Sequence, residues 1–317
     1  MEFAATVVIL TCTYALLAAG IVILYKAGRV VNFAHGELAI VGGYVFYSSG
    51  LMAGGMSVWL AIACALVFSV VMGVVIYMAM MRRLVGQPFY VAILVTVGLG
   101  IVLKSAILVI WRAERLTIDV GVAPAIRLAG GASLSYMDVA SVALTIAFFA
   151  GLYLFFSFTR LGVQFRGTAE NALLASQRGV NVNFVLSLAW VIAIMAASLS
   201  GVLFGGRAFL STESVTIGLA GLTAALVGGL DSLRGAIAGA FIVACAQYLT
   251  VRLIDPVLSE AVPFLLLFLV MSIRPWPVRH GRRTRPGVTR TWLARAPTFG
   301  QTMSRRMRSC AVPIRRC

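Results

Sequence analysis

Charged residues are scarce in this sequence. Only 11% of its 317 residues are Asp, Glu, Lys or Arg, whereas 61% are hydrophobic. Soluble domains carry about a quarter charged residues and about half apolar ones. The larger apolar fraction of this chain therefore suits a lipid environment. A helix crosses the bilayer core with about 20 apolar residues. Because each backbone polar group in lipid must be satisfied within its own segment, the composition predicts an all-α, polytopic transmembrane bundle.

Groups for metal and phosphate chemistry are also few. The chain has two histidines and two lysines, and its five cysteines show no Cys-x-x-Cys spacing, which argues against a zinc site or a disulfide framework. A nucleotide-hydrolysing loop needs Gly-x4-Gly-Lys-Ser/Thr, but neither Lys26 nor Lys104 follows a glycine. The sequence therefore predicts no cofactor, no metal and no enzyme activity, and any ATP must be hydrolysed by a partner.

The apolar runs predict eight or nine spans, some of them broken or re-entrant. The uncharged runs lie at about 4–25, 57–81, 90–111, 137–158, 184–204, 235–251 and 257–273. Segments 30–50 and 215–230 are long enough to cross or dip into the membrane, but they are rich in glycine and other small residues. Such composition is typical of broken or closely packed helices.

Basic residues predict the orientation and the domain division. Twelve arginines and no acid lie from residue 274 onward, while the other 273 residues carry 14 basic and 10 acidic groups. We therefore expect a membrane domain over 1–275 and a disordered, basic cytoplasmic tail over 276–317. Because the tail follows the membrane domain directly, we expect it to contact membrane lipid rather than nucleic acid. Nine crossings with Lys26 inside place 20 basic groups inside and five outside, so the N-terminus should face outward.

A polar cluster stands at the start of the second apolar run. Asn32, His35 and Glu37 lie within six residues and are followed by Gly42 and Gly43. Ionisable groups in a span indicate a gate or a translocation path, although an interfacial cluster that only fixes a helix start has the same pattern. If the helix starts near Val31, Asn32 and His35 share a face, and Glu37 points elsewhere, to pair with Arg29 or with a basic group on a partner. On this hypothesis Glu37 shapes a gate and does not bind solute.

The loop 159–183 predicts a short helix that docks onto a partner. Good helix formers run from Ala169 to Arg178, with an acid near the start and Gly179 as a stop. An apolar face suits a groove on a partner, although a helix lying on lipid has the same pattern. The candidate coupling residues are Glu170, Asn171, Leu173, Leu174, Ala175 and Gly179.

A third run, 218–239, is rich in small residues at three- and four-residue spacing. This spacing lets helices approach each other closely, and a short interrupted helix also suits the lining of a solute path. Gly228 and Gly229 are the path candidates here.

These three segments together resemble one transporter family. VNFAHGELAIVGGY, AENALLASQRGVN and GLTAALVGGLDSLRGAIAGAF are similar to the LivH-type permeases of branched-chain amino acid ABC importers, in the same order over about residues 1–275. The chain differs at Asp231 and Arg234, where family members usually have glycine and proline. Its last 40 or so residues also extend beyond the usual end.

The resemblance implies partners and a location. Such permeases work with a related second permease subunit, two cytoplasmic ATPase subunits and a periplasmic solute-binding protein, in the bacterial inner membrane. The family also takes urea, short amides and other amino acids, so the small-molecule solute stays open. A stand-alone secondary transporter or channel is the main alternative. A structural or signalling membrane protein is a third, which the glycine-rich broken spans disfavour.

Overall fold

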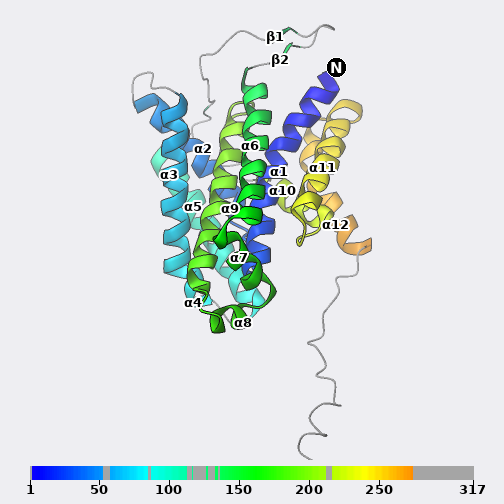
Figure 1. Ribbon diagram of the computed structural model, residues 1–317. Coiled ribbons are helices and arrows are strands. Elements are labelled where there is room, and N and C mark those ends of the chain that lie inside the picture. Colours follow the sequence, from blue (N-terminus) through cyan, green and yellow to red (C-terminus); the bar gives the residue numbers. More distant parts are fainter. Residues whose placement is uncertain are drawn as a thin grey trace, which may run out of the picture. The chain divides into compact units, whose positions relative to one another are not determined.

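The computed structural model describes residues 2–52, 58–84, 87–112, 116, 126–127, 133–134, 136–211 and 216–273. Almost all of them are helical, as the sequence predicts (Figure 1). The helices are α1 (Glu2–Gly28), α2 (His35–Met52), α3 (Val58–Ile76), α4 (Arg82–Leu84), α5 (Phe89–Trp111), α6 (Tyr136–Phe158), α7 (Arg160–Glu170), α8 (Ala172–Gln177), α9 (Val182–Gly205), α10 (Ile217–Gly228), α11 (Leu233–Leu253) and α12 (Val262–Ile273). The predicted basic tail, 276–317, lies outside the described residues.

Four shorter elements accompany these helices in the described residues. A π-helical turn, η1 (Tyr77–Met81), joins α3 to α4, and a 3-10 turn, η3 (Val257–Glu260), precedes α12. Strands β1 (Ile126–Arg127) and β2 (Ser133–Leu134) form an antiparallel pair between α5 and α6.

The predicted number of eight or nine spans is not confirmed. Within the described residues, six helices are long and apolar enough to cross a membrane. Their apolar stretches are Phe3–Gly28, Leu60–Leu84, Tyr90–Trp111, Asp138–Phe158, Val182–Gly205 and Leu233–Leu253. The segments predicted at 30–50, 215–230 and 257–273 contain α2, α10 and α12 instead. Pro263 accounts for the late start of α12, because a proline fits the first helical turn, where its missing N–H is not needed.

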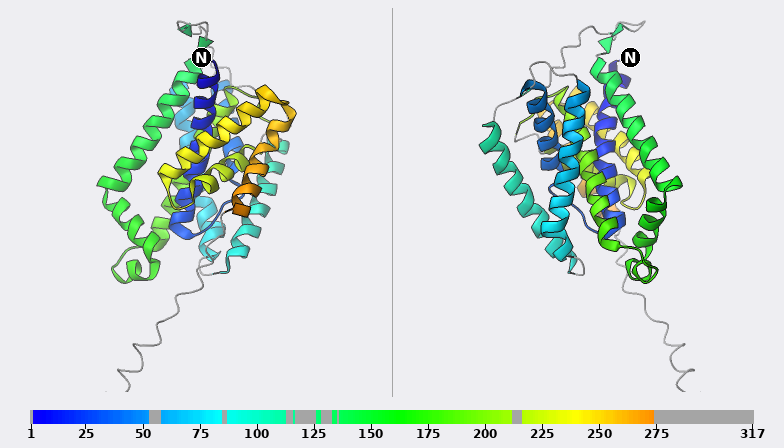
Figure 2. Two further views of the ribbon diagram at one scale, coloured as in Figure 1. Left: turned by 90° about the vertical axis from the view of Figure 1, so that its right-hand side faces the viewer. Right: turned by 60° about the vertical axis from the view of Figure 1, so that its left-hand side comes forward.

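The core is built around α1 and α9. Leu16, Leu17 and Ile21 of α1 are fully buried, and α9 contacts α1, α2 and α3 (Figure 2). All-round apolarity alone does not place α1 at the centre, because the equally apolar stretch Leu60–Leu84 is for the most part not buried; the contacts of α1 with α9, α10 and α11 do. Glycines permit the close contacts, since a Cβ at Gly73 of α3 would lie 2.7 Å from the Cα of Val191 in α9.

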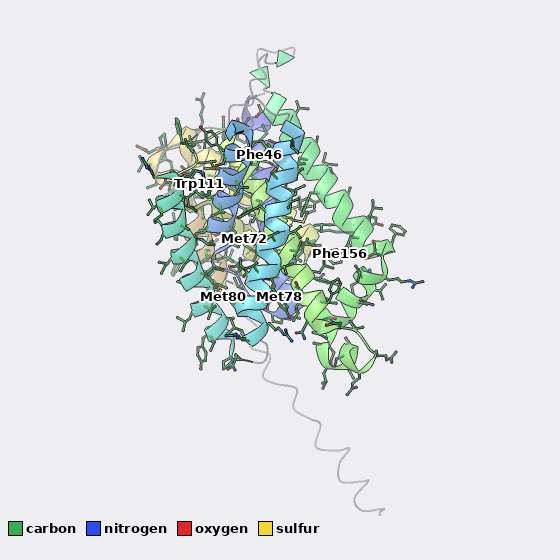
Figure 3. The ribbon with its side chains drawn as sticks, turned by 90° about the vertical axis from the view of Figure 1, so that its left-hand side faces the viewer. Phe46, Met72, Met78, Met80, Trp111 and Phe156 are labelled. Carbon is green, nitrogen blue, oxygen red and sulfur yellow. The ribbon has the colours of Figure 1, made fainter. Side chains whose placement is uncertain are left out.

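The outer helices turn apolar side chains away from this core. Met72 of α3 packs against the core, whereas Met78, six residues later on the same span, is 62% exposed (Figure 3). Val67, Val71 and Val75 form an exposed row on α3. Exposed apolar rows on long apolar helices are typical of surfaces that face lipid or another membrane subunit.

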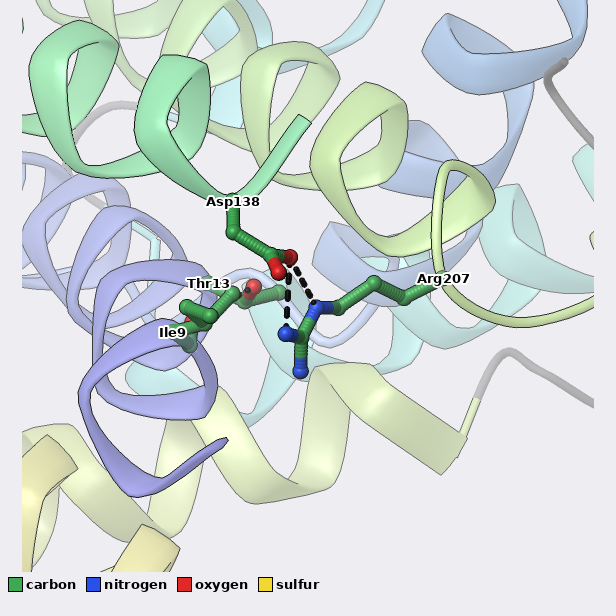
Figure 4. A network of polar contacts seen from close by, with 4 residues as sticks. All are labelled: Ile9, Thr13, Asp138 and Arg207. Atoms are coloured by element: carbon green, nitrogen blue, oxygen red, sulfur yellow. Dashed lines mark hydrogen bonds and ion pairs between the residues drawn. The ribbon is translucent and has the colours of Figure 1, made fainter. Parts of the chain in front are cut away.

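An ion pair that the sequence did not predict ties α6 to the segment after α9. Nε and Nη2 of Arg207 both lie 2.7 Å from Oδ1 of Asp138, beside Thr13 of α1 (Figure 4). The Asp138 side chain is 9% exposed and that of Arg207 31%. An acid in the first turn of α6 is also favoured by the helix dipole.

Asp138→Asn should therefore destabilise the fold. Removing one partner of a buried ion pair costs about 3–5 kcal/mol, and the partial exposure of Arg207 should put the effect below that range. Thermal unfolding of the purified protein in detergent measures it. The exchange variant Asp138→Arg with Arg207→Asp should recover part of the loss, and an unchanged melting temperature in Asp138→Asn would show that the pair contributes nothing to stability.

Candidate functional site

Helix α2 begins in the middle of the bundle. Gly20 of α1 is in close contact with His35 and with the middle of α9. If Gly20 carried a Cβ atom, that atom would lie 2.6 Å from Nε2 of His35 and 2.9 Å from the carbonyl oxygen of Ala193. The chain therefore runs from the end of α1 back into the bundle before α2 starts. Asn32 shapes this return, because its Oδ1 accepts a hydrogen bond of 3.0 Å from the Ala34 N–H.

The short helix α10 starts at the same depth. A Cβ at Gly218, in the first turn of α10, would lie 2.5 Å from the Cα of Gly36, in the first turn of α2. The N-termini of α2, which has 18 residues, and of the shorter α10, which has 12, thus meet inside the bundle. The first N–H groups of a helix have no partner within it, so this meeting point has a partial positive charge.

A cavity of about 890 Å³ opens beside this meeting point. Its polar lining comes from three described parts of the chain: the start of α2, helix α5, and the segments around α10 and η3. The lining residues are Asn32, Phe33, Glu37, Val97, Gly100, Ile101, Lys104, Phe204, Ala208, Phe209, Ser211, Thr216, Gly218, Leu219, Leu222 and Glu260. Since residues 208–211 follow the end of α9, the cavity extends from mid-bundle toward the end of the bundle that holds the start of α1 (Figure 1).

Glu37 and Lys104 place opposite charges on the cavity wall. The Glu37 carboxylate lies against α5, since a Cβ at Gly100 would be 3.0 Å from Oε1 of Glu37, and Lys104 follows Gly100 by one turn. Among the described residues the two do not form an ion pair within 4.0 Å, and Oε2 of Glu37 has no hydrogen-bond partner. Nδ2 of Asn32, a residue only 2% exposed, also lacks a partner. The cavity thus offers donors and acceptors that the protein does not satisfy itself.

Helix α5 is held against α2 on both sides of these groups. Toward the bundle end, the Tyr44 ring stacks on Trp111 at 5.0 Å, and Nε1 of Trp111 donates a 2.7 Å hydrogen bond to Oγ of Ser48. On the other side, the Phe33 N–H donates to Oγ1 of Thr96 at 3.4 Å. These contacts fix the distance between the walls that hold Glu37 and Lys104.

The structure separates the polar cluster that the sequence groups together. Asn32 and Glu37 line the cavity, but His35 is buried against α1 and is not part of the lining. The predicted start near Val31 is wrong, because α2 starts at His35 and Asn32 precedes it. The predicted pairing with Arg29 is also wrong, since Nη1 of Arg29 bonds to Oδ1 of Asp231 at 3.1 Å.

Gly42 and Gly43 lie in a helix contact rather than on the cavity wall. A Cβ on Gly42 would collide with Ser198 of α9, and one on Gly43 would lie 3.0 Å from the Gly201 carbonyl oxygen. Such contacts bring two backbones together without intervening side chains. A role in gating would therefore act through the packing of α2 on α9.

Gly228 and Gly229 form the turn from α10 into α11. Gly229 has φ +93°, a value that favours glycine, and a Cβ on Gly228 would collide with the Gly235 carbonyl oxygen. Oγ of Ser232 accepts a 3.0 Å bond from the Gly235 N–H and so caps α11. Asp231 pairs with Arg29, but both side chains are more than half exposed, so the pair adds little stability.

The predicted coupling loop contains two helices rather than the single one expected from Ala169. Helix α7 ends at Glu170, and Oδ1 of Asn171 accepts 3.1 Å bonds from the N–H groups of Leu173 and Leu174. Asn171 thus caps a new helix, α8, which is why the segment breaks there. Gly179, at φ +82°, follows the end of α8, as a helix stop should.

Only part of the predicted apolar face of α8 is exposed. Leu173 is 68% and Leu174 57% exposed, whereas Ala175 is buried. Glu170 lines a second pocket, of about 460 Å³, together with Lys26, Arg29 and Gln87. The segments predicted to share the cytoplasmic side therefore lie at one end of the bundle.

Sequence reasoning missed Lys104 as part of the site, and it proposed the run 218–239 as lining of a solute path without placing its start beside α2. Lys104 stands well inside a long apolar span, and an ionisable group at that depth is itself a signal of function. The place of Gly218 beside α2 had no signal in the sequence, because it depends on a contact between segments some 180 residues apart.

These features define a polytopic membrane protein with a polar cavity inside its helical bundle, which is the architecture of a solute permease. The chain belongs to the family described as branched-chain amino acid transport system / permease component, whose model matches residues 3–271.

Several relatives are similar over most of their length. The high-affinity branched-chain amino acid transport permease BraD of Pseudomonas aeruginosa is 27% identical over 277 residues, 83% of this chain and 90% of that protein. LivH of Escherichia coli K12 is 29% identical over 291 residues, which cover 84% and 91% of the two chains. A probable LivH of Methanocaldococcus jannaschii is 28% identical over 243 residues, 74% and 76%.

Proposed function

We propose that this chain is a membrane-spanning permease subunit of an ATP-binding-cassette importer for branched-chain amino acids or similar small polar solutes, in a bacterial inner membrane. The 890 Å³ cavity with its unsatisfied polar groups supports this proposal best, because it gives a polar solute a place within an apolar bundle. In this proposal α2, α10 and α12 complete the membrane domain alongside the six long helices.

The partners follow from the same proposal. Two cytoplasmic ATPase subunits would supply the energy, and the exposed Leu173 and Leu174 of α8 would dock onto one of them. A related second permease subunit would cover part of the exposed apolar surface, and a periplasmic binding protein would deliver the solute. Alternating access would then move the solute past the meeting point of α2 and α10.

The test is ATP-driven uptake by the complete importer. The chain, reconstituted with a second permease, ATPase subunits and a binding protein from the same organism, should move radiolabelled leucine, isoleucine or valine into proteoliposomes when ATP is present. Urea and acetamide, tested in parallel, distinguish the other solutes. The chain alone should hydrolyse no ATP. Equal uptake after the ATPase subunits are left out would favour a stand-alone transporter instead.

A further inference from the structure

Glu37 and Lys104 point to direct recognition of both ends of a zwitterion, and they are two of the three charged side chains that line the cavity; the third is Glu260, at the end of η3. Glu37 and Lys104 are held on neighbouring walls by the contacts between α2 and α5, yet among the described residues neither forms an ion pair. An uncompensated charge inside a membrane protein is costly, so such groups are typically paired with each other or with a ligand. A solute with one positive and one negative group would satisfy both.

The surroundings favour a carboxylate at the Lys104 side. The N-termini of α2 and α10 meet beside the cavity. The first turn of α2 already carries the Glu37 carboxylate, whereas the first turn of the short helix α10 has no acid, and half-helix N-termini in membrane transporters face anionic solute groups. Asn32 precedes α2 and lines the same cavity as Lys104, and its buried Nδ2 donor has no partner among the described residues. A carboxylate there would accept bonds from Lys104 and Asn32, while the Glu37 carboxylate would accept bonds from an ammonium group.

The rest of the lining suits an apolar side chain on that solute. Phe33, Val97, Ile101, Phe204, Leu219 and Leu222 surround the polar groups. Urea and simple amides carry neither charge, so they would leave both Glu37 and Lys104 without a partner.

We infer that the cavity between α2, α5 and α10 is a solute subsite in the permease itself, in which Glu37 binds the ammonium group and Lys104, with Asn32, binds the carboxylate of a free amino acid. This inference rests on the proposed function and names the residues that select its solute class. It replaces the expectation that Glu37 only shapes a gate, which depended on a helix starting near Val31.

Protection of a cavity cysteine measures binding directly. In the complete transporter in nanodiscs, without ATP and without binding protein, the Ile101→Cys variant is exposed to a methanethiosulfonate reagent, and modification of that cysteine is followed by mass spectrometry. The probes are L-leucine, leucinamide, which lacks the carboxylate, and 4-methylpentanoate, which lacks the ammonium group. Leucine should protect at lower concentration than either of the other two.

Charge removal should then affect the probes selectively. Lys104→Gln should raise the half-protecting concentration of leucine about 10- to 100-fold, the usual effect of losing a charged hydrogen bond, and leave leucinamide unchanged. Glu37→Gln should raise the half-protecting concentration of leucine and leave that of 4-methylpentanoate unchanged. Lys104→Arg keeps the charge and should keep protection by leucine, and Lys26→Gln removes the other lysine of the chain, outside this cavity, as the matched control.

The outcomes separate this inference from the proposed function. Equal losses for all three probes would show that Lys104 and Glu37 only maintain structure, and unchanged protection by leucine in Lys104→Gln would show that Lys104 does not bind the carboxylate. If leucine is transported with ATP but never protects Ile101→Cys, the subsite is wrong and the proposed function stands. If the complete importer transports no amino acid, the proposed function itself is wrong.

Discussion

Replacing Gly201 by alanine is expected to prevent stable folding of the membrane domain. A Cβ at this position of α9 would overlap the carbonyl oxygen of Ala39 in α2, and backbone atoms cannot move aside as a flexible side chain can. Extra atoms in a well-packed contact usually cost about 1–3 kcal/mol, and more where the backbone must shift. Because this contact fixes where α2 lies, the cavity wall that holds Glu37 should also be displaced.

The measurement is the melting temperature of the purified protein in detergent, together with its yield from membranes. Gly98→Ala on α5 and Gly151→Ala on α6 are matched controls, because a Cβ at either position would meet nothing within 4 Å. Both should be neutral or slightly stabilising, since alanine is favoured over glycine in a helix by up to about 1 kcal/mol. A Gly201→Ala protein as stable as these controls would show that α2 and α9 are not in the close contact described here.

Replacing Leu173 and Leu174 together by alanine is expected to separate the permease from the ATPase subunits of the proposed importer. These neighbouring leucines are largely exposed on a six-residue helix capped by Asn171, so removing them should not disturb the bundle. Burying one leucine in a partner groove contributes about 1.5–3 kcal/mol, so losing two should weaken association by about 100-fold or more. Transport should fall with it.

Co-purification of the ATPase subunits with tagged permease checks this result. Leu253→Ala is the matched control, because Leu253 is 75% exposed at the end of α11 and is not part of α8. The permease level in the membrane should be the same in all variants. Unchanged co-purification would indicate that α8 lies on lipid, the alternative that its sequence leaves open.

The cavity depends on pairings that the sequence alone did not predict. The motif around Asn32, His35 and Glu37 was identified as important, but its geometry was inferred from an uninterrupted helix. An Asn side chain that bonds to the N–H two residues later offers the backbone an alternative to helix, and this is what Asn32 does. The same competition explains why Asn171 divides the coupling loop into α7 and α8.

The sequence by itself determined that this chain is a helical membrane protein of the branched-chain amino acid permease family, without the lysine-bearing loop for ATP hydrolysis. These properties depend on composition, on runs of neighbouring residues and on short motifs, all of which are local along the chain. Only the tertiary structure decided that α2 and α10 start side by side inside the bundle, and that Glu37 faces the same cavity as Lys104, while Asp138 pairs with Arg207. Those contacts join segments 67 to 182 residues apart, and their free energy comes from close backbone approach and charge placement between helices, which no local pattern records.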